Sequence, residues 1–265
     1  MTLKRLMDLR GRRALVTGAT GHIGAVICDT LAELGAEIVL VDLPGSDLKK
    51  IQKKIEQKWK IKTHVLFCDL EFEAQRNQLI KEIKSDSRGL NILINNAAFV
   101  GTSKLLGWTV PFEMQSLATW RRAFEVNLTT AFHLSQGLAP CLRRSAGANI
   151  LNITSIYGHE WPDWSVYKGT KMGNPAAYSV SKGGLIQLTR WLAASLAPKV
   201  RVNAIAPGGL FRNQPKKFVS RYSNNTLLKR MGNESDLIGA ISFLATDLSK
   251  YVTGQNLFID GGRNF

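Results

Sequence analysis

Two copies of a Tyr-x-x-x-Lys pattern lie close together in the stretch VYKGTKMGNPAAYSVSKGG, residues 166–184. One copy runs from Tyr167 to Lys171 and the other from Tyr178 to Lys182. Side chains four residues apart share a face only on a helix, where a lysine ammonium can stabilise a phenolate. Such a pair could exchange a proton with a substrate oxygen, so the two copies are rivals for one chemical role.

The residues around each copy favour the second one. The first copy is interrupted by glycines and followed by a proline, which disfavours a helix. Asn174 and Pro175 instead predict a helix start, with Asn174 as the N-cap and Pro175 in the first helical position. Residues 176–197 then carry leucines at helical spacing. We therefore predict that Tyr178 and Lys182 form the active pair.

Apolar segments and helical patterns alternate along the whole chain, without a repeat or a linker that would divide it. The seven strand-like segments span residues 13–18, 37–42, 63–70, 90–98, 148–155, 200–208 and 256–262. Strands that are apolar on both faces, separated by helices, are typical of a parallel sheet covered on both sides. We predict an α/β fold in one domain, residues 1–265: a doubly wound, mostly parallel seven-stranded sheet of the Rossmann type with helices on both faces.

The carboxyl end of the first predicted strand carries a glycine pattern, TGATGHIG, at residues 17–24. Gly18, Gly21 and Gly24 lie where a strand must turn tightly into a helix and the backbone must approach a pyrophosphate. The N–H groups of the following helix supply a site for an anion. This segment therefore predicts a dinucleotide-binding turn.

Asp42 ends the second predicted strand, 18 residues after Gly24. A carboxylate in this position accepts hydrogen bonds from the adenosine ribose and repels a 2′-phosphate. We therefore expect NAD as the cofactor, while Lys49 and Lys50 are close enough in sequence to keep NADP open. Polar and small residues at the ends of the third and fourth strands should line the same crevice: Asp69, Asn96 and Ala97.

The formal net charge of +15 raises the question of an anionic partner. Much of it lies in Lys49–Lys62, where apolar residues at helical spacing predict an amphipathic helix with lysines on its outer face. No helix-turn-helix, zinc-finger or RNA-binding pattern accompanies the charge, so we expect no nucleic-acid partner. Three widely spaced cysteines in no metal-ligand pattern, no signal peptide and no membrane span predict a cytoplasmic protein without a metal.

These motifs together resemble the short-chain dehydrogenase/reductase family over nearly the whole chain. In chain order they are TGATGHIG, CDL, NNAA, EVNL, ITS, YSVSK, VNAIAPGG and TGQNLFIDGG. The resemblance implies an NAD(P)-dependent oxidoreductase that acts on a hydroxyl or ketone and forms homodimers or homotetramers. The implied catalytic tetrad is Asn127, Ser155, Tyr178 and Lys182. The implied cofactor-binding residues are Gly18, Thr20, Gly21, His22, Ile23, Gly24, Asp42, Asp69, Leu70, Asn96, Ala97, Ala98, Tyr178, Lys182, Pro207 and Gly208.

The resemblance also implies a role for each member of the tetrad. A phenol has an ordinary pKa of about 10, so Lys182 and a positive nicotinamide ring are expected to lower the pKa of Tyr178. Tyr178 then exchanges a proton with the substrate oxygen while hydride moves to or from the nicotinamide. Ser155 hydrogen-bonds the same oxygen, and Lys182 holds the nicotinamide ribose. Asn127 is expected to position a water that connects Lys182 to solvent.

Three departures from the family pattern keep other functions open. His22 stands where single-domain members usually have a glycine, and the resulting spacing resembles the branch of sugar-nucleotide epimerases and dehydratases. Ala98 replaces the glycine of the usual NNAG. Ser155 and Tyr178 are 23 residues apart, more than is typical, whereas Tyr167 has the usual spacing of 12. A 3-oxoacyl-thioester reductase is a further alternative, and outside enzymes an NAD-sensing or nucleic-acid-binding protein.

The extra residues between Ser155 and Tyr178 predict where substrate specificity lies. We interpret residues 157–175 as an inserted loop on the substrate side and residues 208–232 as a substrate loop or lid. The candidate substrate residues are Trp161, Trp164, Tyr167, Lys171 and Arg212. Aromatic faces suit sugar rings and lysines suit anions. The sequence of this region also resembles the family branch of bacterial flagellin-modification and surface-polysaccharide sugar pathways. We therefore expect a small, anionic, sugar-derived substrate, with a surface loop anchored by its tryptophans as the alternative.

Overall fold

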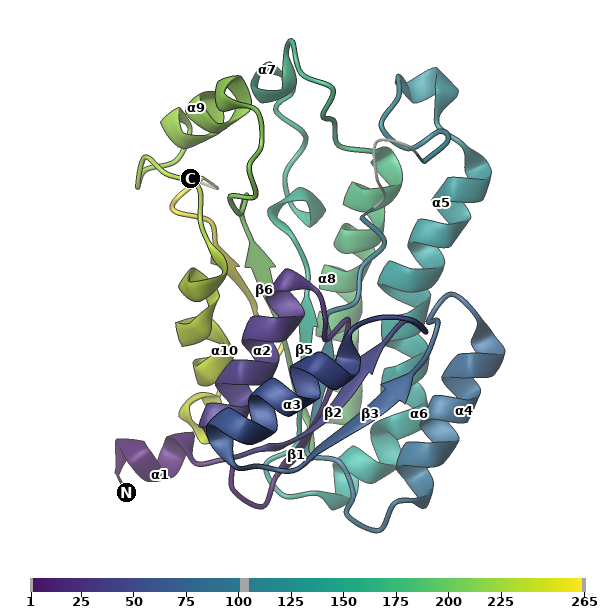
Figure 1. Cartoon of the computed structure of the whole chain (residues 1–265), viewed down its shortest axis with the longest axis vertical. Coiled ribbons are helices and arrows are strands. Elements are labelled where there is room, and N and C mark those ends of the chain that lie inside the picture. Colours follow the sequence, from purple (N-terminus) through teal and green to yellow (C-terminus); the bar gives the residue numbers. More distant parts are fainter. Residues whose placement is uncertain (1, 101–104, 264–265) are drawn as a thin grey trace.

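In the computed structural model, which describes residues 2–100 and 105–263, seven parallel strands form one sheet in the order β3-β2-β1-β4-β5-β6-β7. The strands are β1 (Arg13–Thr17), β2 (Glu37–Asp42), β3 (Thr63–Phe67), β4 (Ile92–Asn95), β5 (Asn149–Ile153), β6 (Arg201–Pro207) and β7 (Asn256–Ile259). Each predicted strand segment contains one of them. The predicted doubly wound α/β fold is therefore confirmed (Figure 1).

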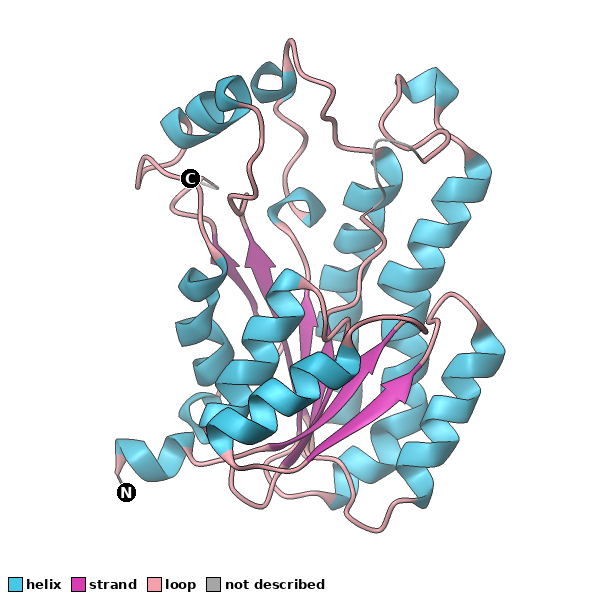
Figure 2. Cartoon of the chain, in the orientation of Figure 1, coloured by secondary structure: helices cyan, strands magenta, loops and turns pink. Residues whose placement is uncertain are grey.

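Helices cover the sheet and the carboxyl ends of its strands, as Figure 2 shows by colour. They are α1 (Leu3–Met7), α2 (His22–Glu33), α3 (Leu48–Trp59), α4 (Glu73–Ser85), α5 (Leu117–Phe124), α6 (Thr130–Arg144), α7 (Trp164–Tyr167), α8 (Ala176–Leu196), α9 (Lys216–Asn224) and α10 (Ile238–Ala245). A π-helical turn, Glu125–Thr129, joins α5 to α6, and short 3₁₀ turns lie at Phe112–Met114, Ile156–Gly158, Glu234–Leu237 and Asp247–Ser249.

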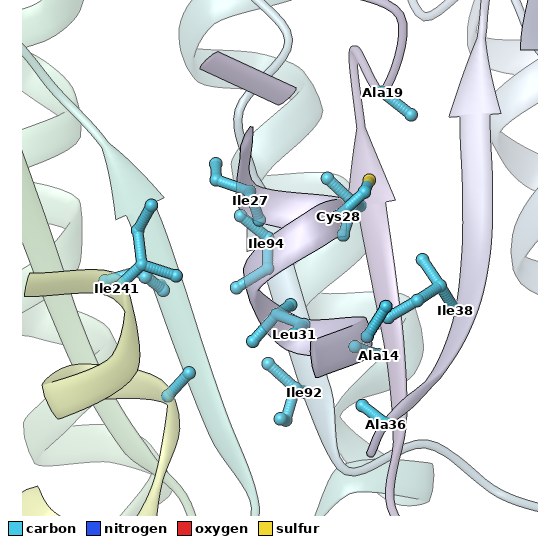
Figure 3. Packing of buried hydrophobic residues seen from close by; sticks show 14 of the residues in the cluster. Ala14, Ala19, Ile27, Cys28, Leu31, Ala36, Ile38, Ile92, Ile94 and Ile241 are labelled. Atoms are coloured by element: carbon cyan, nitrogen blue, oxygen red, sulfur yellow. The ribbon is translucent and has the colours of Figure 1, made fainter. Parts of the chain in front are cut away.

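The alternation of side chains along the strands divides the core into two layers. On one face, Ala14 and Val16 of β1 pack under α2, α3 and α10; Figure 3 shows Ile27 and Leu31 of α2 and Ile241 of α10 in this layer. On the other face, Leu15 of β1 packs under α4, α6 and α8. Both faces of the sheet are therefore covered, and the inner strands β1, β4 and β5 are buried along their whole length.

The predicted amphipathic helix is α3. Leu48 and Ile55 are buried, and the lysines lie on the exposed side. Cys28, Cys68 and Cys141 are all free and buried. In the described part of the chain, the lysines of α3 are therefore exposed on the surface, and the cysteines are buried in the core.

The helix that carries the second Tyr-x-x-x-Lys copy is confirmed, but its start differs by one position. Pro175 is the N-cap residue of α8, and Asn174 precedes it. The N–H of Ala176 is satisfied by Gln115 Oε1 at 3.1 Å, so a residue distant in sequence replaces the expected Asn174 cap. Within α8, Ile186 and Leu192 are buried, whereas Trp191 is 58% exposed.

Candidate active site

A cavity of about 490 Å³ lies beyond the carboxyl ends of β1, β2 and β4, where the strand order reverses and doubly wound folds bind ligands. Twelve of the predicted cofactor residues line it: Gly18, Thr20, Gly21, His22, Ile23, Gly24, Asp42, Asp69, Leu70, Asn96, Ala97 and Ala98. Tyr178, Lys182, Pro207 and Gly208 are not among its lining residues. Pro207 ends β6, and the N–H of Gly208 donates to Ile259 O at 2.9 Å.

The glycine turn has the close approaches that a dinucleotide site requires. Gly18 has φ +65°, a conformation that favours glycine, and a Cβ at Gly24 would lie 1.9 Å from Gly18 O. Asn96 Nδ2 donates to Thr17 O and Gly18 O at 2.8 and 3.1 Å, which fixes the turn against the end of β4. Gly21 is the N-cap of α2 and carries no side chain that would cover the first helical N–H groups. This cradle fits a pyrophosphate.

Asp42 is held at the edge of the same cavity by hydrogen bonds to its carboxylate. Oδ2 accepts from Thr20 N and Thr20 Oγ1 at 2.8 and 2.6 Å, and Oδ1 accepts from Leu43 N at 2.8 Å. Lys49 and Lys50 do not line this cavity but a separate hollow on the outer side of α3. Asp42 therefore lines this cavity while the two lysines lie outside it, and its contact with a ribose stays a prediction.

Ser155, Tyr178 and Lys182 are brought together where β5 ends against α8. Gly158 permits the contact, because a Cβ there would lie 2.7 Å from the backbone carbon of Lys182. Ser155 lies close enough to Tyr178 to lower the pKa of its hydroxyl. Lys182 Nζ lies 6.0 Å from the centroid of the Tyr178 ring and donates to Ile153 O at 2.7 Å. The second Tyr-x-x-x-Lys copy thus faces the end of β5.

Burial shifts the pKa of both members of this pair. It lowers the pKa of Lys182 to about 8, because the charged ammonium loses hydration. It raises the pKa of Tyr178, against smaller lowering effects of the Ser155 hydrogen bond and the Arg212 guanidinium. The groups of the protein by themselves therefore shift the pKa of Tyr178 upward, opposite to the direction expected beside a positive nicotinamide ring.

Asn127 lies in the π-helical turn between α5 and α6 and is buried. Its Oδ1 accepts from Phe99 N at 2.6 Å, and its Nδ2 donates to Ser181 Oγ at 3.0 Å. The side chain therefore links the segment after β4 to α8, close in sequence to Lys182. It bonds neither Tyr178 nor Lys182 directly, and the expected water relay stays a prediction.

The first Tyr-x-x-x-Lys copy has a different environment. Tyr167 is the last residue of α7, and no helix connects it to Lys171. The Tyr167 side chain is 8% exposed, and its hydroxyl is hydrogen-bonded to that of Tyr157 at 2.5 Å. Tyr167 and Lys171 nevertheless line a cavity of about 270 Å³ that also contains Tyr178. The predicted insertion therefore contributes to the surroundings of Tyr178.

The inserted loop and the lid pack against each other, as α7 and α9 do in Figure 1. Val166 and Tyr167 form a small core with Phe218 and Tyr222 of α9. The loop is therefore anchored by these residues and not by its tryptophans, since Trp161 and Trp164 are 84% and 59% exposed. Trp161 does not line the cavity of Tyr178.

The lid, residues 208–232, is closed at its base. Phe211 N donates to Gly232 O at 2.8 Å, and Gly232 N donates to Gly209 O at 3.0 Å. Arg212 comes directly after Phe211 in the chain and forms an ion pair with Glu234 at 3.0 Å. It lines the cavity of about 490 Å³ and not the cavity of Tyr178.

The cavity of about 490 Å³ is also lined by Glu71 and Arg122, which were not predicted from the sequence. Arg122 of α5 forms two hydrogen bonds with Glu71, at 2.7 and 3.0 Å, and lies over the ring of Phe99. Glu71 directly follows the predicted Asp69 and Leu70, so an extension of that motif would have found it. Arg122 could be recognised as a residue of this cavity only from the structure, which brings α5 next to the segment that follows β3.

No group of three or more His, Cys, Asp or Glu side chains that could hold a metal ion occurs among residues 2–100 and 105–263. In the same ranges, no helix combines the length and apolar character needed to cross a membrane.

The fold and the glycine cradle define a dinucleotide-dependent α/β protein, and the comparisons specify its class. A family model described as enoyl-(acyl carrier protein) reductase matches residues 18–264. The chain is 30% identical to the 3-oxoacyl-[acyl-carrier-protein] reductase FabG of Aquifex aeolicus, over 97% of this chain and 98% of the relative. It is 31% identical to a probable galactose dehydrogenase, GalD, of Rhizobium meliloti, over 96% of both chains.

Solved structures agree with these relatives. A 7α-hydroxysteroid dehydrogenase complexed with NADH and 7-oxo glycochenodeoxycholic acid superposes with a TM-score of 0.85 at 29% identity, over 99% of this chain and 98% of the other. An NAD⁺-bound xylitol dehydrogenase superposes with a TM-score of 0.84 at 28% identity, over 96% and 99%. The chain belongs to the short-chain dehydrogenase/reductase family and is an NAD(P)-dependent oxidoreductase.

Proposed function

We propose that the protein transfers hydride between a nicotinamide cofactor and a hydroxyl or carbonyl group, with Tyr178 as the general acid and base. The observation that carries this proposal is that Ser155, just after the end of β5, lies beside Tyr178, which shares helix α8 with buried Lys182. The bound nicotinamide supplies or accepts the hydride. In reduction Tyr178 donates its phenolic proton to the substrate oxygen, and in oxidation it accepts the hydroxyl proton.

The neighbouring residues support this role of Tyr178. Ser155 can hydrogen-bond the same substrate oxygen, because its side chain lies close enough to Tyr178 to lower the pKa of that hydroxyl. Lys182, whose pKa of about 8 leaves it mostly charged at neutral pH, stabilises the phenolate and holds the nicotinamide ribose. The cradle of Gly18, Gly21 and Gly24 binds the pyrophosphate.

We propose a substrate with an anionic group, and a sugar-derived substrate is the expected class. Lys171 supports the anionic group because it lines the cavity of Tyr178. GalD and the xylitol dehydrogenase support the sugar class by their similarity. A second candidate is the reduction of 3-oxoacyl thioesters, which the similarity to FabG and the matching family description favour. Homodimers or homotetramers remain a prediction, for which exposed Trp191 offers apolar surface.

A substrate panel tests the proposed function. The wild-type enzyme is mixed with NAD or NADP and with polyols, sugar acids, sugar phosphates and sugar nucleotides, and cofactor reduction is followed by absorbance. Reduction of 3-oxoacyl thioesters is measured in parallel. Turnover of sugar derivatives supports the first proposal, whereas turnover of thioesters alone supports the second. Tightly retained NAD with no net turnover would instead indicate an epimerase or dehydratase.

Asp42→Asn is expected to change the cofactor preference. The amide keeps an oxygen that can accept from Thr20 but loses the charge that repels a 2′-phosphate. We expect the ratio of the NADPH and NADH dissociation constants to shift toward NADPH by about tenfold, equivalent to about 1.4 kcal/mol. Asp47→Asn removes the same charge from an exposed residue outside the cavity and should leave the ratio unchanged. Equal shifts in both variants would show that only net charge matters.

A further inference from the structure

A second, larger cavity adjoins the one that contains Tyr178. This outer groove has a volume of about 690 Å³, within the range of sites for drug-sized ligands. The residues that line both cavities are Trp108, Thr109, Lys171, Met172, Gly173, Asn174 and Pro175. The groove therefore adjoins the cavity of Tyr178 along these residues, and a substrate that reaches past them would extend into the groove.

The walls of the groove are held by contacts between distant segments. Residues 108–115 form one wall: Trp108 Nε1 donates to Val100 O at 2.8 Å, and Gln115 Oε1 accepts from the first N–H of α8. The inserted loop forms the other wall and is anchored behind the groove by Val166 and Tyr167. The two walls are in contact at Gly173, where a Cβ would lie 3.0 Å from Thr109 Cγ2. The groove is thus part of the folded structure.

The lining of the groove is mainly apolar and rich in rings. Its most exposed apolar side chains are Phe112, Trp164 and Val180, at 75%, 59% and 49%. Pro111, Pro162, Met172 and Pro175 complete the apolar surface. No acidic side chain is among the described residues that line the groove. Flat aromatic and proline surfaces bind the faces of ring systems, and exposed apolar patches of this kind often mark ligand-binding grooves.

The junction between the two cavities carries two hydrogen-bond donors without partners. Lys171 makes no hydrogen bond or ion pair with the described residues and lines both cavities. Asn174 is 6% exposed, and its Oδ1 accepts from Ser179 Oγ at 3.2 Å, which leaves its buried Nδ2 unpaired. Buried donors are nearly always paired in proteins, so this position suits an acceptor group of a ligand.

We propose that the outer groove binds the apolar, ring-containing body of an elongated anionic substrate. Its reacting hydroxyl or carbonyl lies at Tyr178, its acidic group lies at Lys171 and Asn174, and its rings lie between Phe112 and Trp164. The proposal rests on the proposed function and adds a substrate class to it. The occupant is a substrate and not a partner protein, because the groove adjoins the cavity of Tyr178 and shares seven lining residues with it.

A binding experiment tests the groove without turnover. The probes are 1-anilinonaphthalene-8-sulfonate and its uncharged counterpart N-phenyl-1-naphthylamine, titrated into the NADH-loaded enzyme and followed by fluorescence. Phe112→Ala and Trp164→Ala should weaken both probes by about tenfold, because each removes an aromatic contact. Lys171→Gln should weaken only the sulfonate, by about threefold, as for an exposed ion pair.

Matched variants distinguish the groove from other binding surfaces. Phe72 is 55% exposed and lines neither cavity, so Phe72→Ala should bind both probes like the wild type. Lys168 is exposed in the same inserted loop and lines neither cavity, so Lys168→Gln should bind the sulfonate like the wild type. Equal affinities in Phe112→Ala, Trp164→Ala and wild type would overturn the proposal, as would equal losses in Lys168→Gln and Lys171→Gln.

A kinetic comparison links the groove to catalysis. Reduction of 2-acetylnaphthalene and of butan-2-one by NADH is measured in wild type and in Trp164→Ala. We expect kcat/KM to fall about tenfold for the naphthyl ketone and to stay unchanged for butan-2-one, which fits the inner cavity. Equal losses for both ketones would contradict a role in substrate selection. No turnover of either ketone by the wild type, together with groove-dependent probe binding, would put the proposed function in doubt and not the groove.

Discussion

Tyr178→Phe is expected to lower kcat by about a thousandfold, within the range of general acid–base catalysis, and to leave NADH binding intact. The substitution removes only the hydroxyl that lies beside Ser155 and that would exchange a proton with the substrate. Lys182 keeps its hydrogen bond to Ile153 O, so the ribose side of the site is preserved. The measurement is steady-state kinetics on the substrate found by the panel, with the dissociation constant of NADH determined by fluorescence.

Tyr167→Phe is the matched control, because it removes the same atom from the other Tyr-x-x-x-Lys copy. The Tyr167 hydroxyl is bonded to Tyr157, so its loss should lower the free energy of unfolding by about 1 kcal/mol. We expect kcat to stay within about threefold of wild type, a difference of less than 1 kcal/mol. Full activity of Tyr178→Phe together with an inactive Tyr167→Phe would reverse the assignment of the two tyrosines.

The two tyrosines show which features a sequence can and cannot predict. The helix around Tyr178 was predictable because helix propensity, proline position and leucine spacing act locally. The environment of Tyr167 was not, because it depends on Tyr157 and on Phe218 of α9, 51 residues further along the chain (218 − 167). The role of a five-residue pattern therefore depends on the elements that surround it.

The same distinction explains the rest of the site. The strands and the glycine cradle were predictable, since burial on both faces and tight strand-to-helix turns leave local patterns. The outer groove was not, because its walls meet through contacts such as Gln115 with Ala176. The upward pKa shift of Tyr178 also depends on burial, which a sequence does not specify. Residues 157–175 line part of the cavity of Tyr178, and their role as a substrate-side insertion stays a prediction. Their anchoring by Val166 and Tyr167 instead of the tryptophans required the structure.

Gly24→Ala is expected to have the second large effect, on both stability and cofactor binding. A Cβ at this position would lie 1.9 Å from Gly18 O and 2.9 Å from Asn96 Nδ2, so α2 would have to move away from the end of β1. That movement breaks the hydrogen bond from Asn96 to Gly18. Overpacking against backbone costs about 3 kcal/mol or more. We expect a lower Tm and NADH binding at least about a hundredfold weaker, or about 2.7 kcal/mol.

Gly239→Ala tests whether the cost comes from this close approach and not from replacing a helical glycine. Gly239 lies in α10, and a Cβ there would have no atom within 4 Å. Alanine in a helix is more stable than glycine by about 0.5–1 kcal/mol, so Tm should rise slightly or stay constant, with NADH affinity unchanged. Thermal unfolding and NADH titration of both variants give the comparison. If Gly24→Ala bound NADH like wild type, the turn after β1 would not be the pyrophosphate cradle, and the cofactor would have to bind elsewhere along the carboxyl ends of the strands.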